Sequence, residues 1–451
     1  MKRFIGNKAF YLKTISISLP IMAQQFVTSF VNLIDNIMIG NVGSLALTSV
    51  TVANRIYLIF NSTLFGISGA AGIFIAQYFG AKNIKKCQQI LNLNILIALI
   101  ISILFVTSLI FIPGYLVSFF TSEPDIMNES LKYFQYALFA YIPYSFSFTV
   151  MMALRAVGIN KIQLLVGALT VLTNTTLNYI LIFGNFGFPE LGVQGAAIAT
   201  SIARFLEMLI YAFLLIRKRH LFQLQIKQWF IIQWDLVKSL TRKAIPLTMN
   251  EILFSTGMAM VFISYMRCDS SLISATSVVD TSMQIAFIVF SGLSSAVAIL
   301  IGNRLGANQI EEAKDNANKL IAFGMAVGVV IGLIFIGLAP VIASFYNVGD
   351  EIKSTIVSLL TIKSCLLPFY VYNVCVFFTL RAGGDALSTL IMDSGFLWCV
   401  NVTVSTILSI FFNIPLVIMY MMVESLDILK LFIATYFYRK GKWARNMTVD
   451  M

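Results

Sequence analysis

Long apolar runs recur along the whole chain of 451 residues, and they restrict the possible folds more than any other feature. Each run holds roughly 20 residues, enough for a helix rising 1.5 Å per residue to cross a hydrocarbon core about 30 Å thick. The runs lack the alternation that is typical of a membrane β-barrel. Because 59% of the residues are hydrophobic and only 11% are charged, the composition indicates an integral membrane protein built from α-helices.

We expect about twelve membrane helices in an all-α polytopic fold. Their predicted first residues are Thr14, Leu45, Ile90, Ser130, Ile162, Val193, Lys243, Leu272, Lys319, Ser354, Leu387 and Asn413. The connections alternate between basic segments and segments that are acidic or nearly uncharged. The positive-inside rule then predicts a multi-pass protein with both termini in the cytoplasm, and the chain suits a prokaryotic inner (plasma) membrane.

The net charge of +11 does not indicate a nucleic-acid-binding protein. Basic residues such as Lys82, Lys85 and Lys86 lie in particular connections and at the two ends, where they serve as topology signals. The five cysteines are scattered and contain no CxxC pair, so neither a disulfide framework nor a zinc site is indicated. We expect membrane lipid and small molecules as partners, and a monomeric protein.

The two halves of the sequence repeat one another at a spacing of 226 residues. Three pairs keep this spacing: Pro20 with Pro246, Gly80 with Gly306, and Arg155 with Arg381 (246 − 20 = 306 − 80 = 381 − 155 = 226). The repeat predicts two pseudo-symmetric six-helix lobes, residues 1–216 and 244–451, joined by a basic cytoplasmic linker at 217–243. An even number of helices in each half gives both lobes the same orientation, an arrangement typical of alternating-access transporters.

Asp35 interrupts the first apolar run. A carboxylate in hydrocarbon costs at least about 2.5 kcal/mol, so such a residue indicates a functional site unless it reaches the membrane surface. A straight helix from Lys13 would carry Asp35 about 33 Å along its axis, which keeps an interfacial position open. If the side chain faces the interior, it could exchange a proton or a sodium ion.

Further carboxylates interrupt the apolar runs of the second half. Glu251 lies about 12 Å beyond Lys243 if a helix begins there, which places it well inside the membrane. Pairing with a neighbouring polar group is the alternative to a functional role. Asp280 is a candidate for a cation or substrate site together with Glu251, although packing or a helix-end position explains it equally well. For Asp393, near the start of its helix, stabilisation by the helix dipole is the simpler account.

Several segments resemble the multidrug and toxic compound extrusion (MATE) family of secondary transporters. The matching pieces are "LPIMAQQFVTSFVNLIDNIMIGNVG", "FIAQYFGAKN", "LRAVGINK", "NTTLNYILIFGNFGFPELGVQGAAIATSIAR" and "LRAGGD". This resemblance implies two lobes around a V-shaped cleft. It also implies export of amphipathic organic cations from the cytoplasm, driven by inward flow of Na+ or H+.

The resemblance also implies a site in the first lobe. Asp35 matches an acidic residue of the first helix that is linked to coupling. A fifth-helix asparagine, an aspartate four residues later and a sixth-helix threonine correspond to Asn174, Asn178 and Thr200, so an amide replaces the family's aspartate here. Asp35, Asn174 and Asn178 are thus the candidate ligands of a Na+ ion. Because the two asparagines share one helix face, hydrogen bonding between helices, worth about 0.6 kcal/mol on average, is the alternative.

In another branch of the family, an acidic residue early in the seventh helix takes part in coupling. Glu251 of "IPLTMNEILF" fits that place. We therefore expect a second coupling or substrate site in the C-terminal lobe that involves Glu251 and Asp280.

The predicted function is cation-coupled multidrug efflux by antiport. A flippase for a lipid-linked saccharide or another lipid is the alternative within the same broad superfamily. An enzyme is not expected, because the chain has a single histidine and no Walker loop or nucleophile elbow. A receptor or a structural protein would leave the paired halves without a purpose. No cofactor is expected beyond Na+ or H+ as the coupling ion.

Overall fold

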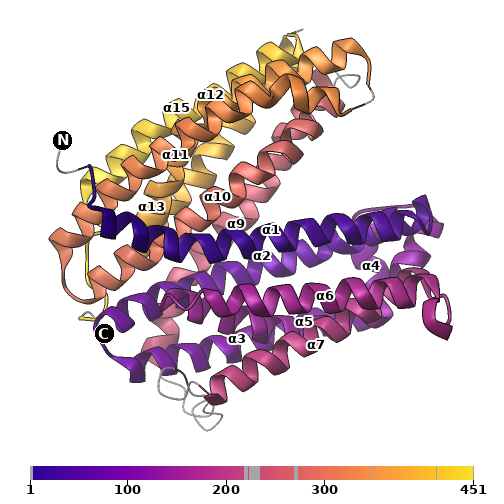
Figure 1. The fold of residues 1–451 in the computed structure, drawn as a ribbon, viewed down its shortest axis with the longest axis horizontal. Helices are drawn as coiled ribbons and strands as arrows, with labels where there is room; N and C mark the ends of the chain where they lie inside the picture. The colour runs from indigo at the N-terminus through magenta and orange to yellow at the C-terminus, as the bar shows by residue number, and fades with distance from the viewer. Residues whose placement is uncertain are drawn as a thin grey trace. The chain divides into compact units, whose positions relative to one another are not determined.

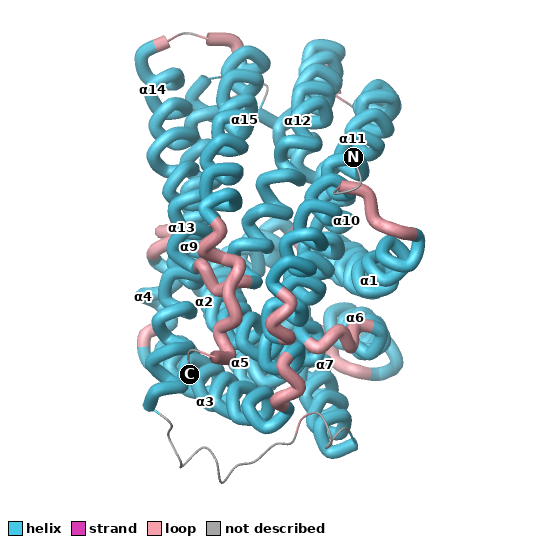
Figure 2. The backbone as a smooth tube through the Cα atoms, turned by 90° about the vertical axis from the view of Figure 1, so that its left-hand side faces the viewer, coloured by secondary structure: helices cyan, strands magenta, loops and turns pink. Residues whose placement is uncertain are grey.

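The computed structural model describes residues 4–217, 222, 234–268, 273–346, 348–412 and 414–449. All regular elements in this part of the chain are helices, joined by loops (Figure 2). The predicted all-α fold is therefore confirmed. The predicted helix starts at Leu272 and Asn413 and most of the predicted linker lie outside the described residues.

The helices follow one another with short connections. The first half contains α1 (Lys8–Gly40), α2 (Ser44–Gly80), α3 (Ile84–Phe111), α4 (Pro113–Ser118), α5 (Pro124–Ala156), α6 (Lys161–Phe183), η1 (Asn185–Gly187) and α7 (Gly192–Arg217). The second half contains α9 (Trp234–Cys268), α10 (Ile273–Gly306), α11 (Ile310–Ser344), α12 (Asp350–Ala382), α13 (Ala386–Leu390), η2 (Ile391–Gly395), η3 (Leu397–Val402), α14 (Thr403–Phe411) and α15 (Leu416–Lys440).

Eleven helical segments of the described chain are long and apolar enough to span a membrane. One of them is the continuous segment Ala386–Phe411, which runs from α13 to α14 and contains the π-helical turns η2 and η3. The helix α15 is also long enough, with 25 residues, but it carries Glu424, Asp427 and Lys430 in its middle. Together with α15, the segments match the predicted number of about twelve.

Several helices begin earlier than the apolar runs indicate. The helix α3 starts at Ile84 rather than Ile90, and α5 starts at Pro124 rather than Ser130. The added first turns contain polar residues, for example Lys85 and Lys86 of α3. A helix needs no apolar side chains where it leaves the membrane, so hydropathy alone places these starts too late.

The chain divides into two compact units, which we call the N-unit (Ala23–Ala244) and the C-unit (Met1–Met22 with Ile245–Met451). Two helices contribute to both units. The division falls two residues after Pro20 in α1 and just before Pro246 in α9, and these prolines are partners in the sequence repeat. Each proline removes one backbone hydrogen bond from its helix. The lobe boundaries predicted from the sequence stay a prediction.

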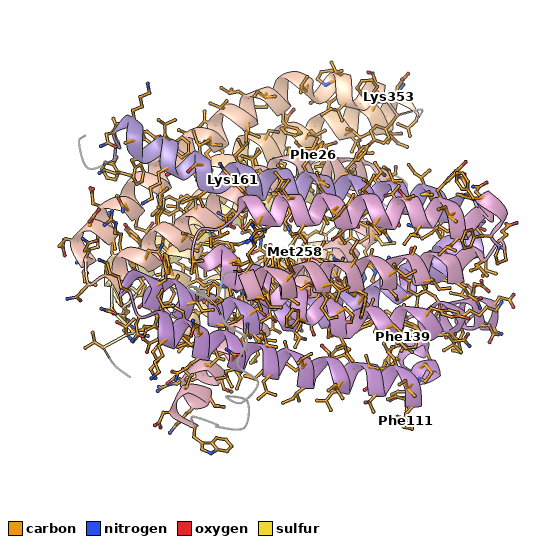
Figure 3. All side chains as sticks on the ribbon, turned by 60° about the horizontal axis from the view of Figure 1, so that its bottom comes forward. Phe26, Phe111, Phe139, Lys161, Met258 and Lys353 are labelled. Carbon is orange, nitrogen blue, oxygen red and sulfur yellow. The ribbon has the colours of Figure 1, made fainter. Side chains whose placement is uncertain are left out.

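The outer faces of the helices are apolar. In the N-unit, Phe111 and Phe139 project outward from α3 and α5 (Figure 3), with 78% and 63% of their surface exposed. Exposed aromatic side chains on a helix that can span a membrane are suited to contact with lipid. Most of the polar side chains described below are instead buried or half-buried between helices, Asp280 being exposed.

Glycines bring α11 and α12 of the C-unit close together, and the two helices run side by side (Figure 1). A Cβ atom on Gly332 would lie 2.5 Å from the backbone oxygen of Ser364, and one on Gly328 would lie 3.0 Å from the Cα of Pro368. Small residues of this kind let membrane helices gain van der Waals contact.

Replacement of Gly332 by alanine is expected to destabilise the C-unit. The new methyl group would push α12 away, at a cost of about 1–3 kcal/mol, because its neighbour is backbone rather than a flexible side chain. Gly337→Ala on the same helix is the control, since no atom lies within 4 Å of its added Cβ. Thermal denaturation in detergent should rank Gly332→Ala well below the parent and Gly337→Ala level with it. Equal melting temperatures for the two variants would contradict the close-packing role.

Candidate functional site

A chain of polar side chains crosses the interior of the N-unit. The amide nitrogen Nδ2 of Asn178 donates to the carboxylate oxygen Oδ1 of Asp35 over 2.8 Å. The same nitrogen lies 3.4 Å from Oδ1 of Asn174, whose own Nδ2 donates to the hydroxyl of Thr200 over 3.3 Å. The structure therefore brings together all four residues predicted for this lobe, from α1, α6 and α7.

Helix geometry explains this convergence. Asn174 and Asn178 are four residues apart on α6, so they occupy one face, which packs against α7. Both are buried, with 8% and 1% of their surface exposed, whereas Asp35 is half-buried. Asp35 forms no ion pair with any residue that the structure describes. Its direct polar contact is the hydrogen bond from Asn178, and the guanidinium of Arg204 acts on it electrostatically without forming an ion pair.

One buried atom in this row of polar side chains lacks a hydrogen-bond partner among the described residues. The carbonyl oxygen Oδ1 of Asn178 is buried and accepts no hydrogen bond from the described residues. Buried polar atoms in proteins nearly always have a partner, so each exception needs an explanation. A carboxylate, two amide oxygens and a hydroxyl are hard oxygen donors, the type of ligand that small unpolarisable cations prefer. The cluster is chemically able to hold Na+, and its carboxylate is able to hold a proton.

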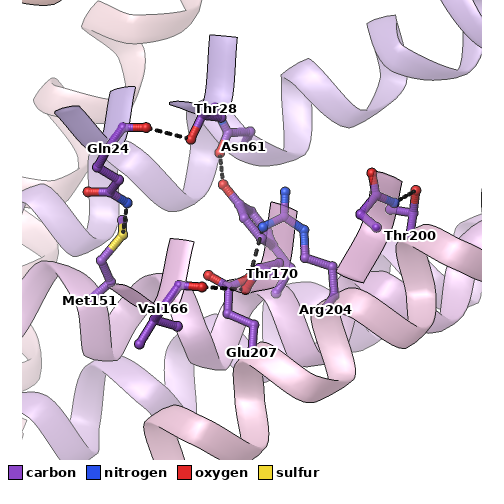
Figure 4. A network of polar contacts seen from close by, with 11 residues as sticks. Gln24, Thr28, Asn61, Met151, Val166, Thr170, Thr200, Arg204 and Glu207 are labelled. Atoms are coloured by element: carbon purple, nitrogen blue, oxygen red, sulfur yellow. Dashed lines mark hydrogen bonds and ion pairs between the residues drawn. The ribbon is translucent and has the colours of Figure 1, made fainter. Parts of the chain in front are cut away.

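An ion pair that sequence analysis missed follows one turn further along α7. Nη1 of Arg204 lies 2.8 Å from Oε2 of Glu207 (Figure 4). The guanidinium carbon lies 4.6 Å from the centre of the Tyr144 ring. The hydroxyl of Tyr144 donates to Oδ1 of Asn61 over 2.5 Å. The sequence signal for this pair was the presence of two opposite charges, three positions apart, inside the apolar run of α7. We call Arg204, Glu207, Tyr144 and Asn61 the arginine cluster.

A second arginine contact lies at the C-terminal end of α5. Nη2 of Arg155 is 3.4 Å from Oε1 of Gln24 on α1, and Nε of Arg155 is 3.4 Å from Oε1 of Gln163 on α6. Figure 4 shows Gln24 beside Met151, with its amide nitrogen 3.4 Å from the sulfur. The hydrogen bonds from this guanidinium are therefore accepted by amide oxygens rather than by a carboxylate.

The repeat partner of Arg155 makes the corresponding contact in the C-unit. Nη1 of Arg381 lies 3.1 Å from Oε1 of Glu251 on α9. The arginine side chain is 5% exposed and the glutamate side chain 24% exposed. An arginine at the same repeat position thus contacts the proline-containing helix in both units, through an amide in the N-unit and a carboxylate in the C-unit. The two acceptors differ by one position in the repeat, since Glu251 aligns with Gln25 (251 − 226 = 25). Glu251 pairs with a neighbouring polar group, which was the alternative to a functional role, and Arg381 neutralises its charge.

Asp280, the other residue predicted for the C-lobe site, is exposed on α10. It makes no ion pair with a described residue and interacts electrostatically with Lys363 of α12. No hydrogen bond or ion pair between described residues joins Asp280 to Glu251. The structure therefore does not assemble these two carboxylates through a direct contact, and the predicted C-lobe site stays a prediction.

Two half-buried lysines of the C-unit, Lys363 and Lys430, were missed by sequence analysis. Nζ of Lys430 lies 2.5 Å from Oδ1 of Asp393, whose other oxygen accepts a hydrogen bond of 3.2 Å from Asn250. Lys363 forms an ion pair with Glu424. The account of Asp393 as a residue stabilised by a helix dipole is therefore wrong: it lies within the π-helical turn η2 and is neutralised by a lysine from α15.

Two helical units with polar chains buried inside them are the architecture of a polytopic membrane transporter, a class of protein that is not enzymatic. The MatE family model matches residues 20–180 and 246–407, and these two matches begin 226 residues apart (246 − 20 = 226). The chain belongs to this family of multidrug and toxic compound extrusion transporters.

Curated and solved relatives cover nearly the whole chain. The protein is 24% identical over 438 residues to a probable multidrug resistance protein NorM of Thermotoga maritima, covering 96% of this chain and 93% of the relative. The MATE transporter VcmN of Vibrio cholerae, solved in a bent form, shares 18% identity with a TM-score of 0.88, covering 97% and 98% of the two chains. A MOP superfamily transporter from Pyrococcus furiosus, described as having a binding pocket of reverse polarity, shares 16% identity with a TM-score of 0.87 and 96% coverage of both chains.

Proposed function

We propose that this protein is a multidrug efflux antiporter that exports amphipathic organic cations by alternating access, coupled to inward movement of Na+ or H+. The observation that carries this proposal is the chain Asp35–Asn178–Asn174–Thr200, which holds a half-buried carboxylate without an ion-pair partner among the described residues. Curated relatives named as multidrug resistance proteins support the efflux part.

Asp35 is the proposed acceptor of the coupling ion. A proton or Na+ that binds there neutralises the carboxylate, and the buried Oδ1 of Asn178 offers a further ligand for a metal ion. Neutralisation removes the strongest acceptor of the Asn178 hydrogen bond and so changes how α1 packs against α6. Glu251 is a weaker candidate for this role, because Arg381 already balances its charge. In this proposal both termini lie in the cytoplasm of a bacterial cell.

The alternative of a lipid flippase receives less support from the buried cations. A transporter of an anionic headgroup would need basic side chains that are free to bind it. Lys363, Lys430 and Arg381 each form an ion pair with a carboxylate in the described part of the chain. Arg155 has no carboxylate partner among the described residues, but its guanidinium is held by the amides of Gln24 and Gln163. We therefore favour organic cations as substrates.

Efflux from proteoliposomes tests the proposal, with ethidium as the probe and with Na+ and H+ gradients imposed separately. We expect one gradient to drive efflux in the parent and Asp35→Asn to abolish that coupling, since an amide cannot take up the ion as a carboxylate does. Glu251→Gln, which retains a partner for Arg381 as Gln24 does for Arg155, should keep most of the activity. If Asp35→Asn is folded and transports like the parent, Asp35 is not the coupling residue; if neither gradient moves ethidium, multidrug antiport is wrong.

A further inference from the structure

Each unit holds a basic residue at the same repeat position in its last long helix. Arg204 of α7 and Lys430 of α15 are 226 residues apart, as are Tyr144 of α5 and Tyr370 of α12 (430 − 204 = 370 − 144 = 226). The partners of the two cations differ, however. Lys430 pairs with Asp393 from another helix, whereas Arg204 pairs with Glu207 from its own.

Arg204 lies close to the Asp35 chain along α7. It follows Thr200 by four residues, which corresponds to about 6 Å along the same helix face. Its positive charge acts on Asp35 electrostatically. A guanidinium that acts on Asp35 opposes the binding of any cation there, unless another charge cancels it.

Glu207 supplies that second charge. Its side chain is 10% exposed and lies in direct contact with the guanidinium of Arg204. The Tyr144 ring packs against the guanidinium from α5, and the hydroxyl of Tyr144 is held by Asn61 of α2. The guanidinium is therefore held in place by side chains from its own helix and from α5.

Two carboxylates and one guanidinium meet in this region of the N-unit, so the ionised groups sum to one negative charge (2 − 1 = 1). Arg155, another cation of this unit, lies eleven residues from Tyr144 along α5, about 16 Å away along the helix axis, and contacts Gln24 and Gln163. One monovalent cation is thus enough to neutralise the region around Asp35. Because residue 178 is an asparagine and adds no charge, this balance depends on Glu207.

We infer that Glu207 neutralises Arg204 and thereby allows Asp35 to bind the coupling cation, so that the Arg204–Glu207 pair sets the ion affinity of the N-unit. Glu207 acts through Arg204 and is a positioning residue, not an ion ligand. This inference rests on the proposed function, because it assumes that Asp35 takes up the ion. It adds a specific claim: the net charge of the groups around Asp35 decides the affinity for the coupling cation, and the Arg204–Glu207 ion pair matters only through that net charge.

The test measures the concentration of the driving ion that gives half-maximal ethidium efflux. We expect Glu207→Gln to raise this concentration by about tenfold or more, because Arg204 then acts on Asp35 without compensation. The double variant Arg204→Gln with Glu207→Gln restores a net charge of minus one and should return to the parent value. Arg204→Gln alone leaves two carboxylates and should lower the half-maximal concentration below that of the parent.

A purely structural role of the pair gives a different pattern. The double variant would then resemble Glu207→Gln, and Arg204→Gln would not bind the ion more tightly than the parent; either result overturns the inference. If Glu207→Gln does not fold, Arg204→Gln and the double variant still decide the question, since neither leaves an arginine without its partner.

Asp393→Asn in the C-unit is the matched control. It removes the carboxylate partner of Lys430, the repeat counterpart of Arg204, and so imposes a similar loss of an ion pair in the other unit. We expect its half-maximal ion concentration to equal that of the parent; a shift as large as that of Glu207→Gln would overturn the inference. Asp35→Asn in the same assay tests the proposed function separately: if its coupling is lost while Glu207→Gln behaves like the parent, the inference alone fails.

Discussion

Replacement of Lys430 by methionine is expected to destabilise the folded protein by about 3–5 kcal/mol, because it leaves the Asp393 carboxylate buried without a counter-charge. Lys430 lies in the middle of α15 with 12% of its side chain exposed, and Asp393 is 17% exposed. The hydrogen bond from Asn250 to Asp393 compensates only part of the loss, since an amide carries no net charge. The expected readout is a melting temperature in detergent several degrees below that of the parent.

The double variant Lys430→Met with Asp393→Leu separates the cost of breaking the pair from the cost of removing it. Apolar replacement of both partners of a buried ion pair is often neutral or stabilising, so this variant should recover most of the lost stability. Lys440→Met, at the exposed end of the same helix, should leave the melting temperature unchanged. The expectation is wrong if Lys430→Met melts with the parent, or if the double variant is as unstable as the single one.

The membrane helices and the internal repeat could be predicted from the sequence because both leave long signals. Apolar runs of about 20 residues are hard to explain except as spans, and a constant spacing over several helices is hard to produce by chance. The last helix, α15, was also predicted, but not how Glu424, Asp427 and Lys430 are accommodated in its apolar pattern. Pairing of Glu424 with Lys363 and of Lys430 with Asp393 makes these charges tolerable, and pairing depends on tertiary structure.

The contacts from Asp35 to Thr200 join the four residues that sequence analysis grouped, and their role in coupling stays a prediction. The arginine cluster was missed. The spacing of Asn174 and Asn178 signals a shared helix face, but their contact with α1 and α7 came from resemblance to the family. Arg204 and Glu207 were overlooked because charges near one another in an apolar run are easily taken for a helix-surface pair. The repeat spacing offered a usable signal, since it aligns Arg204 with Lys430.

Contacts that occur in both units identify residues needed for the fold, and residues found in one unit only are candidates for function. Arg155 and Arg381 both hold the last turn of a helix to a side chain near a proline, so this contact belongs to the scaffold that both units need. The carboxylate at Asp35 has no such counterpart, because the repeat places Val261 there (261 − 35 = 226). A group that occurs in only one unit is not required by the shared fold. A carboxylate in a membrane helix is costly, and the proposed binding of the coupling ion would account for that cost at Asp35.

Replacement of Asn178 by aspartate is expected to raise the affinity for Na+ by about tenfold or more at pH 8, where both carboxylates can ionise around the metal ion. Without Na+, the two carboxyl groups would repel each other and share one proton, since Asp35 lies within hydrogen-bond distance of residue 178. The gain in Na+ affinity should therefore shrink as the pH falls and protons compete for the site. Equilibrium binding of radioactive Na+ to the purified protein measures both effects.

The exchange of Asp35 and Asn178 distinguishes the charge of the site from the identity of the residue that carries it. The double variant Asp35→Asn with Asn178→Asp keeps one carboxylate and one amide in the contact that joins α1 to α6. If the site requires only one negative charge among oxygen ligands, this variant should bind the coupling ion more tightly than Asp35→Asn alone. If it binds no better, the carboxylate must be on α1, and movement of α1 after its neutralisation becomes the step that couples ion binding to transport.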